Sequence, residues 1–322
     1  MKSVVGSSFG LARQWLTESA EAWSRFWFTP CSPRVISVLR ILAGAMLVYS
    51  HLVWAMDLGS FLGPDAWIDN DTAKSLHDGS FGFSDAARSY LWNIDSMGLL
   101  WAHHVVAILI AIAFTLGFLT RLSGPLSLFL QLMLLHRLTG MLFGLDQILT
   151  YCLMYLSIGP SGACYSVDAW LRRRLTGDRL AWLFPADRPS VSANVATRLL
   201  QIHLCVIYFF GGIAKARGTT WWDGSAMWLS AANYEYQSVP LTWIVDYPRL
   251  GALLSNATML WELSYVALIW PRLTRPVFLV IAVMVHAGIG IFLGMITFGT
   301  MMIIANLIFV SPKLFSCQSC EA

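Results

Sequence analysis

The chain has 322 residues, of which 57% are hydrophobic and 12% are charged, and its formal net charge is +3. A soluble domain of this size carries about twice that share of charged residues, and the mean hydropathy of +0.62 is typical of a membrane protein. The small net charge gives no reason to expect a nucleic acid as a partner. We therefore expect an all-α, polytopic integral membrane protein in contact with the lipid bilayer, because helices satisfy their own backbone hydrogen bonds in lipid.

The N-terminal segment, residues 1–33, is too polar for a cleavable signal peptide, and the apolar run after it is long enough to span a bilayer. Large apolar side chains recur among its charged residues between positions 11 and 28, namely Leu11, Trp15, Leu16, Trp23 and Phe26. This mixture predicts an amphipathic helix that lies on the membrane surface.

Apolar runs of the length that crosses a bilayer recur along residues 34–312, which predicts one membrane domain and no soluble domain. The runs number about eight, at 35–58, 99–118, 122–143, 146–160, 196–214, 250–270, 276–293 and 295–311. Residues 313–322 then form a short cytoplasmic tail. The chain shows no internal repeat of the kind that builds an inverted-repeat transporter.

Lysine and arginine are distributed unevenly between the segments that connect these runs. With the N-terminus inside, the inner segments hold fourteen of the 21 basic residues and the outer segments hold six, while Arg40 lies within the first run. This distribution satisfies the positive-inside rule. We therefore expect a protein of the bacterial inner membrane, with both termini in the cytoplasm and Lys215 on the extracytoplasmic side.

Two outer loops have unusual compositions. The loop at 59–98 contains six aspartates together with glycine, proline and aromatic residues, and it is long enough to fold over the bundle as a lid. The loop at 215–249 is dense in tryptophan and tyrosine, among them Trp221 and Trp222. Such aromatic residues often serve only as membrane anchors. If a site lies at Lys215, we expect both loops to cover it and to exclude water.

The most informative residue is Lys215, at the outer end of the fifth run, because a lysine between apolar sequence and an aromatic loop is a functional candidate. Gln201 and Tyr208 precede it at intervals of seven residues, so the three side chains share one helix face. Gly211 and Gly212 leave room beside this face for a helix or a flat ring. Desolvation favours the neutral amine, which can act as a base. The alternative, of about equal weight, is a lysine that merely extends toward the membrane surface.

Four further polar residues lie within the runs and are candidates for ligand binding: Arg40, Asp146, Glu262 and His286. Asp146 opens a helix, where the helix dipole also favours an acid for purely structural reasons. Glu262 needs a partner or a proton at its depth, and Arg40, Lys215 or a histidine could supply it. A lone histidine such as His286 is more often a hydrogen-bonded interior residue than a ligand.

No metal site is expected. The histidines show no His-x-x-x-His or His-x-x-Glu spacing, and the terminal pair Cys317 and Cys320 supplies only half of a zinc site. The glycine motifs that bind phosphates or dinucleotides are missing, and so is the Gly-x-Ser-x-Gly elbow of hydrolases. These absences argue against an ATP-driven or nicotinamide-dependent reaction.

Four sequence elements stand out together: Phe143-Gly-Leu-Asp146-Gln-Ile-Leu, Tyr165-Ser-Val-Asp168-Ala-Trp, Tyr208-Phe-Phe-Gly-Gly-Ile-Ala-Lys215 and Trp221-Trp222-Asp223-Gly224. In this combination the chain resembles the HTTM (horizontally transferred transmembrane) family, which includes the membrane part of vitamin K-dependent gamma-carboxylase. The resemblance extends from about Arg34 to Pro312, and the third and fourth elements are its most specific parts.

The resemblance implies that Lys215 is the base that deprotonates a reduced quinone of the vitamin K or menaquinone type, whose reaction with oxygen drives carboxylation of a glutamate side chain. Two departures weaken this implication. The carboxylase has a large C-terminal peptide-binding region, whereas this sequence ends shortly after its last apolar run, which leaves open whether a soluble partner protein supplies that function. The carboxylase also has a catalytic histidine in the helix that Asp146 opens, where this chain has Asp146 and Gln147.

Two functions therefore remain open. The first is an enzyme, a quinol-dependent carboxylase-like lyase or oxidase, in which Lys215 is the base and Gln201 and Tyr208 orient the quinol. The second is a non-catalytic binding or scaffold protein, or a permease for a small lipid, which helps in the maturation of a secreted peptide. Geometry separates the two. A base needs a cavity that reaches its nitrogen and no carboxylate in direct contact, whereas a structural lysine is enclosed and paired.

Overall fold

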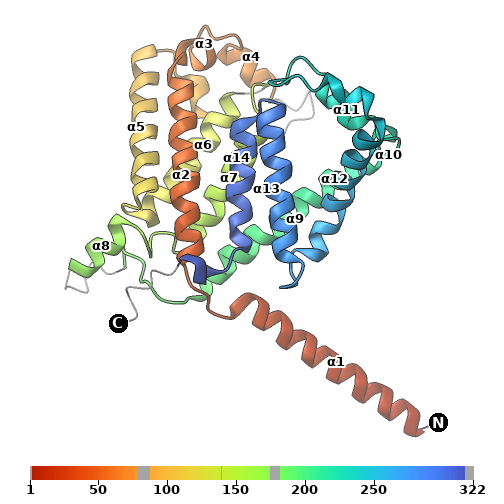
Figure 1. Ribbon diagram of the computed structural model, residues 1–322. Coiled ribbons are helices and arrows are strands. Elements are labelled where there is room, and N and C mark those ends of the chain that lie inside the picture. The colour runs from red at the N-terminus through yellow and green to blue at the C-terminus, as the bar shows by residue number, and fades with distance from the viewer. Residues whose placement is uncertain (1, 78–87, 139, 175–181, 316–322) are drawn as a thin grey trace.

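The computed structural model describes residues 2–77, 88–138, 140–174 and 182–315, and most of these residues are helical (Figure 1). Eight of the helices fall on the eight predicted apolar runs: α2 (Arg34–Ala55), α5 (Met97–Leu116), α6 (Thr120–Arg137), α7 (Gly144–Ile158), α9 (Val191–Ala216), α12 (Pro248–Leu268), α13 (Arg275–Phe292) and α14 (Ile296–Asn306). The described residues form no strand, only one isolated β-bridge between Cys31 and Ser190. The predicted all-helical architecture is confirmed.

Four of these helices, α2, α5, α9 and α13, are long and apolar enough to cross a membrane by themselves. The remaining four are shorter or more polar; α7, for example, has 15 residues and α14 has 11. About 20 residues are needed to span the hydrocarbon core without help. The structure thus supports a membrane protein with several apolar helices, and the count of eight crossings stays a prediction.

The helices of the bundle run alternately up and down (Figure 1). Helices α1 (Lys2–Phe28) and α8 (Val167–Arg174) lie at the lower end of the view, whereas α3 (Leu58–Leu62), α4 (Asn70–Ser75), α10 (Thr219–Trp222) and α11 (Ala226–Ala231) lie at the upper end. We call these the terminal end and the cap end. The alternation agrees with the order of inner and outer segments expected from the basic residues, but it does not show which end faces the cytoplasm.

The predicted N-terminal helix is present as α1 (Lys2–Phe28), which projects away from the terminal end of the bundle (Figure 1). Asn194 of α9 donates hydrogen bonds of 2.8 Å to the carbonyl oxygens of Phe26 and Trp27 and thereby fixes the point where α1 leaves the bundle. Trp15 and Trp23 are exposed along α1. Exposed tryptophans suit a helix on a membrane surface, a position that stays a prediction.

Two fully buried charged residues hold the terminal end together. The Asp168 carboxylate accepts hydrogen bonds from the backbone N–H of Leu119 at 2.7 Å and from the N–H and hydroxyl of Thr120 at 2.8 and 2.6 Å, at the start of α6. Arg40 of α2 donates to the carbonyl oxygens of Ser161 and Tyr165 at 2.7 and 2.6 Å. These contacts satisfy backbone groups that have no partner within a helix.

The described part of the acidic loop covers only part of the cap end. In its described portion, α3 packs on α2 and α5, while α4 packs on a short 3-10 helix, η1 (Tyr90–Asn93), which contacts α6. On the other side of the cap, α10 and α11 pack on α12. Figure 1 shows the two groups over different parts of the bundle. The described part of the loop is therefore not the lid over Lys215 that the sequence suggested, and Trp221 of α10 covers that residue instead.

The main hydrophobic core is built by α2, α7, α9, α12, α13 and α14. Helices α9 and α12 approach each other closely at Gly212, where an added Cβ would lie 2.9 Å from the backbone nitrogen of Leu263. A side chain cannot be placed at that distance without moving one helix. Gly212 thus brings the face of α9 that carries Lys215 against α12, the helix that carries Glu262.

Candidate functional site

The amine of Lys215 forms a direct ion pair with Glu262. The Nζ atom donates a hydrogen bond to Oε1 at 3.0 Å and lies 2.7 Å from Oε2, and the two side chains are 25% and 12% exposed. The ring of Trp221 lies 5.2 Å from the same nitrogen, a cation–π distance. By the geometric criterion above, a carboxylate in contact argues against Lys215 as a lone base. The remaining exposure shows that the pair is not sealed.

The pair lies within the bundle rather than at its end. Glu262 follows the first residue of α12, Pro248, by 14 positions, which corresponds to about 21 Å along the helix axis. It precedes the last residue of α12 by six positions, or about 9 Å. A charged pair at this depth costs desolvation energy that only close pairing offsets. Lys215 lies in the last turn of α9, one residue before Ala216, and ends the apolar part of that helix, as expected.

The carboxylate packs against the backbone of α9 at Gly211. A Cβ at Gly211 would lie 3.3 Å from Oε2 of Glu262 and 3.8 Å from Nζ of Lys215, so a residue larger than glycine would crowd the pair. Oε2 is buried, and the group it pairs with among the described residues is the Lys215 amine at 2.7 Å. The carboxylate therefore has lone pairs that no group other than Lys215 occupies in the described part of the chain.

A chain of hydrogen bonds lies one to two turns further into the bundle. The Tyr208 hydroxyl lies 2.8 Å from Nε2 of His286, and the Asn306 amide donates to the same hydroxyl at 2.7 Å. The Tyr265 hydroxyl donates to the Asn306 carbonyl oxygen at 2.6 Å. All four side chains are buried. In the part of the chain that the structure describes, Nδ1 of His286 and the indole nitrogen of neighbouring Trp261 have no partner.

The structure thus unites part of the predicted set. Lys215, Glu262, Gly211 and Trp221 meet at one point, and Tyr208 and His286 form the adjacent network. Gly212 contributes by bringing the two helices together.

Four predicted residues lie elsewhere, namely Gln201, Arg40, Asp146 and Trp222. Gln201 is about 21 Å from Lys215 along α9 and donates to the carbonyl oxygen of Ile308 at 3.0 Å. Arg40 is used at the terminal end. Asp146 accepts the backbone N–H of Phe143 at 3.0 Å, the capping role that its place at the start of α7 suggested.

Trp222 is exposed and donates to the carbonyl oxygen of Ala216 at 2.7 Å, so it fastens α10 to the end of α9 rather than covering the ion pair.

Three residues of the site were missed from the sequence: Trp261, Tyr265 and Asn306. Asn306 is the one with a usable signal, because it is an amide within the last apolar run. Tyr265 and Trp261 lie one turn after and one residue before Glu262, but aromatic residues are too common in this chain to stand out.

The Trp-Trp-Asp-Gly motif has a structural explanation. Asp223 accepts hydrogen bonds from the N–H and hydroxyl of Ser225 at 2.8 and 2.7 Å, which lower the pKa of the exposed Asp223 carboxyl below its usual value. The Asp223 carboxylate is therefore hydrogen-bonded within its own turn, and the carboxylate that pairs with Lys215 is that of Glu262. Gly224 has a φ of +84°, and a Cβ there would lie 2.3 Å from that of Ala252 in α12. Only glycine fits this turn.

Metal binding finds no support among the described residues, which contain no group of three His, Cys, Asp or Glu side chains arranged to hold an ion. Four cysteines, Cys31, Cys152, Cys164 and Cys205, have free thiols. The pair Cys317 and Cys320 lies outside the described residues.

Comparison with known proteins supplies one result. Neither the curated proteins nor the solved structures contain a match to this chain. A sequence profile of the HTTM domain matches residues 28–313, a range that includes all eight helices of the bundle and both halves of the Lys215–Glu262 pair. The match covers nearly the whole chain, in agreement with the four motifs, and the protein therefore belongs to the HTTM domain family.

Proposed function

We propose that this protein binds a hydroxyl-bearing amphiphile of the reduced-quinone type within its helix bundle and removes a proton from the hydroxyl group. The observation that carries the proposal is the Lys215–Glu262 pair, which is partly exposed, packs against α9 at Gly211, and makes no hydrogen bond beyond the pair itself among the described residues. The family suggests the quinol as the ligand. The Lys215–Glu262 pair is the basis for proposing that a hydroxyl group is bound here and loses its proton.

The geometry assigns the two charges different roles from those of a lone lysine base. A protonated amine that donates to Oε1 has no lone pair to accept a proton, so the group that can accept one is the carboxylate. In this scheme the partly exposed Glu262 carboxylate receives the hydroxyl proton. Lys215 then stabilises the negative charge left on the ligand oxygen, an effect that is strong where water is excluded. Trp221 helps to exclude water.

The test has two parts. Mass spectrometry of lipids that copurify with the wild-type protein identifies the ligand class, and we expect a quinone. Turnover of a short-chain quinol by Glu262→Gln should be lost, because the amide cannot accept the proton, while Glu235→Gln, the same change at an exposed position outside the site, should keep wild-type turnover. A Glu262→Gln protein that is folded and fully active overturns the proposal.

A non-catalytic protein is the second candidate, and the same ion pair favours it, because buried pairs often serve only to fix the register of two helices. In that case Glu262→Gln changes stability, and the copurified lipid shows no quinone. The measurements above therefore separate the two functions without further variants.

We also propose that the terminal end faces the cytoplasm of a bacterial inner membrane and that the Lys215 site opens toward the cap end. The support is the excess of basic residues in the segments at the terminal end. A fluorescent protein fused to the C-terminus should fold and fluoresce, and an alkaline phosphatase fused there should be inactive. The reverse result would invert the orientation.

A further inference from the structure

Two arginines at the terminal end have no acidic partner among the described residues. Arg198 lies two turns into α9, about 25 Å from Lys215 along that helix, and Arg275 is the first residue of α13. Their guanidinium groups are half-buried and lie close enough to repel each other. The rings of Phe26 in α1 and Trp270 after α12 adjoin Arg198. We call these four residues the junction site, because α1 leaves the bundle here.

The segments that build the junction site supply no counter-charge. Residues 22–56, 188–222 and 263–315 contain the end of α1, the whole of α9 and α13, and the end of α12, and they hold no aspartate or glutamate. Two like charges in a partly buried place destabilise the fold unless an anion compensates them. The compensating anion therefore has to come from outside these segments.

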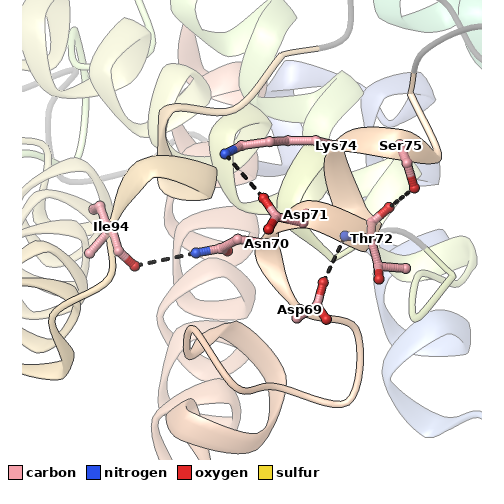
Figure 2. Close-up of polar contacts among 7 residues, drawn as sticks. All are labelled: Asp69, Asn70, Asp71, Thr72, Lys74, Ser75 and Ile94. Atoms are coloured by element: carbon pink, nitrogen blue, oxygen red, sulfur yellow. Dashed lines mark hydrogen bonds and ion pairs between the residues drawn. The ribbon is translucent and has the colours of Figure 1, made fainter.

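Acidic residues that border these segments or lie at the cap end interact with groups of their own. Glu21 pairs with Arg25 at 3.2 Å, and Asp187 accepts a hydrogen bond from a neighbouring thiol at 3.0 Å. At the cap end, Asp71 lies 3.7 Å from the amine of Lys74 within the same short helix, α4 (Figure 2). The two junction arginines differ, because no carboxylate in the described part of the chain pairs with them.

Arg198 is held in one orientation by its neighbours. Its guanidinium carbon lies 4.5 Å from the ring centroid of Phe26 and 5.9 Å from that of Trp270, both cation–π distances. Nη1 donates a hydrogen bond to Oε1 of Gln201 at 3.0 Å, and the Gln201 amide in turn donates to the carbonyl oxygen of Ile308. Gln201, which the sequence suggested for the quinol, thus orients an arginine. A guanidinium fixed in this way loses little side-chain entropy when it binds an anion.

Each arginine retains a donor group that solvent can reach. Arg275 donates through Nε and Nη2 to the carbonyl oxygens of Ile269 and Trp270 at 3.1 and 2.6 Å, and it thereby caps the C-terminal end of α12. Nη1 of Arg275 and Nη2 of Arg198 make no hydrogen bond among the described residues, and neither atom is fully buried, in contrast to Nε of Arg198. Two planar guanidinium groups with available N–H donors match the oxygens of a phosphate.

Exposed apolar side chains occur in both elements that border the site. Trp23 and Phe28 of α1 are exposed, and on the α13 side so are Leu273 and Val277. An anion with acyl chains would use both the cations and these apolar side chains, whereas free phosphate would use the cations alone. Basic pockets between membrane helices bind anionic lipid headgroups in this way.

We propose that the junction site binds the phosphate group of an anionic phospholipid from the leaflet at the terminal end. Nη2 of Arg198 and Nη1 of Arg275 donate to the phosphate oxygens, and the acyl chains lie along the exposed apolar side chains. A zwitterionic phospholipid also has a phosphate, but it brings a cation close to the two arginines and is therefore bound less tightly. The inference goes beyond proton removal at the Lys215–Glu262 pair and does not depend on it.

Native mass spectrometry of the full-length protein in a non-ionic detergent measures the binding of added lipid. The probes are phosphatidylglycerol and phosphatidylcholine with identical acyl chains, and inorganic phosphate is the competitor. We expect phosphatidylglycerol to bind about tenfold more tightly than phosphatidylcholine because of its net charge, and to stay bound in a large excess of phosphate. Equal binding of the two lipids overturns the proposal. Displacement of phosphatidylglycerol by phosphate shows a free-anion site and refutes the lipid assignment.

Matched variants locate the binding. Arg198→Gln and Arg275→Gln should each weaken phosphatidylglycerol binding about fivefold through loss of a hydrogen bond, and so lower its preference over phosphatidylcholine. Arg198→Lys keeps the charge without the planar fork, and its affinity should lie between those of the wild type and Arg198→Gln. Arg174→Gln removes an equal charge from an exposed position of α8, at the same end but outside the junction site, and should leave the affinity unchanged.

Circular dichroism establishes that each variant is folded. A folded Arg198→Gln protein that keeps the wild-type preference for phosphatidylglycerol contradicts the proposal, because Arg198 then has only a structural role. If Arg174→Gln weakens binding as much as Arg198→Gln, the lipid responds to the overall charge of the terminal end, and the junction site is refuted. Glu262→Gln, which tests quinol turnover, should leave lipid binding unchanged, so the two proposals succeed or fail separately.

Discussion

The Lys215–Glu262 pair allows a quantitative test of how α9 and α12 are held together. Replacing Lys215 with Met removes the cation and leaves the largely buried Glu262 carboxylate without a counter-ion. Breaking a fully buried pair costs about 3–5 kcal/mol. Because the two side chains are 25% and 12% exposed, solvent screens part of this cost, and we expect about 2–3 kcal/mol.

Glu262→Met should lower the free energy of unfolding by a similar amount, since it leaves the Lys215 amine without its counter-ion. The double variant Lys215→Met/Glu262→Met leaves no charge, and methionine packs well in irregular apolar space. We therefore expect it to recover most of the loss and to lie within about 1 kcal/mol of the wild type, giving a coupling energy of about 3 kcal/mol or more.

The assay is the free energy of unfolding from reversible SDS titration in mixed micelles, with helix content followed by circular dichroism. Glu235→Gln serves as the control because Glu235 is exposed in the loop before α12 and should leave stability unchanged within about 0.5 kcal/mol. Additive losses in the double variant would show that the two charges do not interact in the folded protein. The paired geometry, and the mechanism built on it, would then both be wrong.

Three further substitutions test other parts of the fold by the same measurement. Asp168→Ala should cost about 3 kcal/mol or more, because it strands three hydrogen-bond donors at the start of α6; a loss below about 1 kcal/mol would contradict this role. Gly224→Ala should cost about 2–4 kcal/mol from its left-handed backbone and its contact with Ala252, and an unchanged stability would show that the turn can move. Gln131→Leu should stabilise by about 1–3 kcal/mol, because the Gln131 amide is fully buried and unpartnered among the described residues; destabilisation would reveal a partner.

The positions of the helices could be predicted from the sequence because apolar periodicity and glycine or proline breaks are local properties. The run at 35–58 became α2 (Arg34–Ala55), and the run at 196–214 lies within α9 (Val191–Ala216). Whether a helix crosses the membrane by itself depends on length and polarity together. For this reason 15-residue α7 fell on a predicted run without meeting the requirement of a lone span.

The site was only half predictable because its parts meet through tertiary packing. Lys215 and its helix face followed from spacing, and Glu262 was recognised as a carboxylate in need of a partner. Which partner it takes depends on the approach of α9 and α12 at Gly212, a distance that no local pattern encodes. Arg40, like Lys215, is a basic residue in an apolar run of the sequence. The packing of the helices nevertheless places its guanidinium against carbonyl groups at the terminal end.

Two groups of buried polar residues in this protein differ in whether their hydrogen bonds are complete, and that difference points to their roles. Every oxygen of Asp168 is occupied by donors of the fold itself, which leaves the carboxylate nothing to offer a ligand. Among the described residues, Glu262 pairs only with Lys215, whose amine lies 3.0 Å from one oxygen and 2.7 Å from the other, and Nδ1 of His286 has no partner. A chain selected only for stability would gain by closing these positions with apolar side chains, because unsatisfied buried groups are costly. Other buried groups without partners lie elsewhere in the described residues, for example Nε of Arg40 at the terminal end. Trp261, Glu262 and His286 differ in lying together around Tyr208, and this grouping is why we assign ligand chemistry to this part of the bundle.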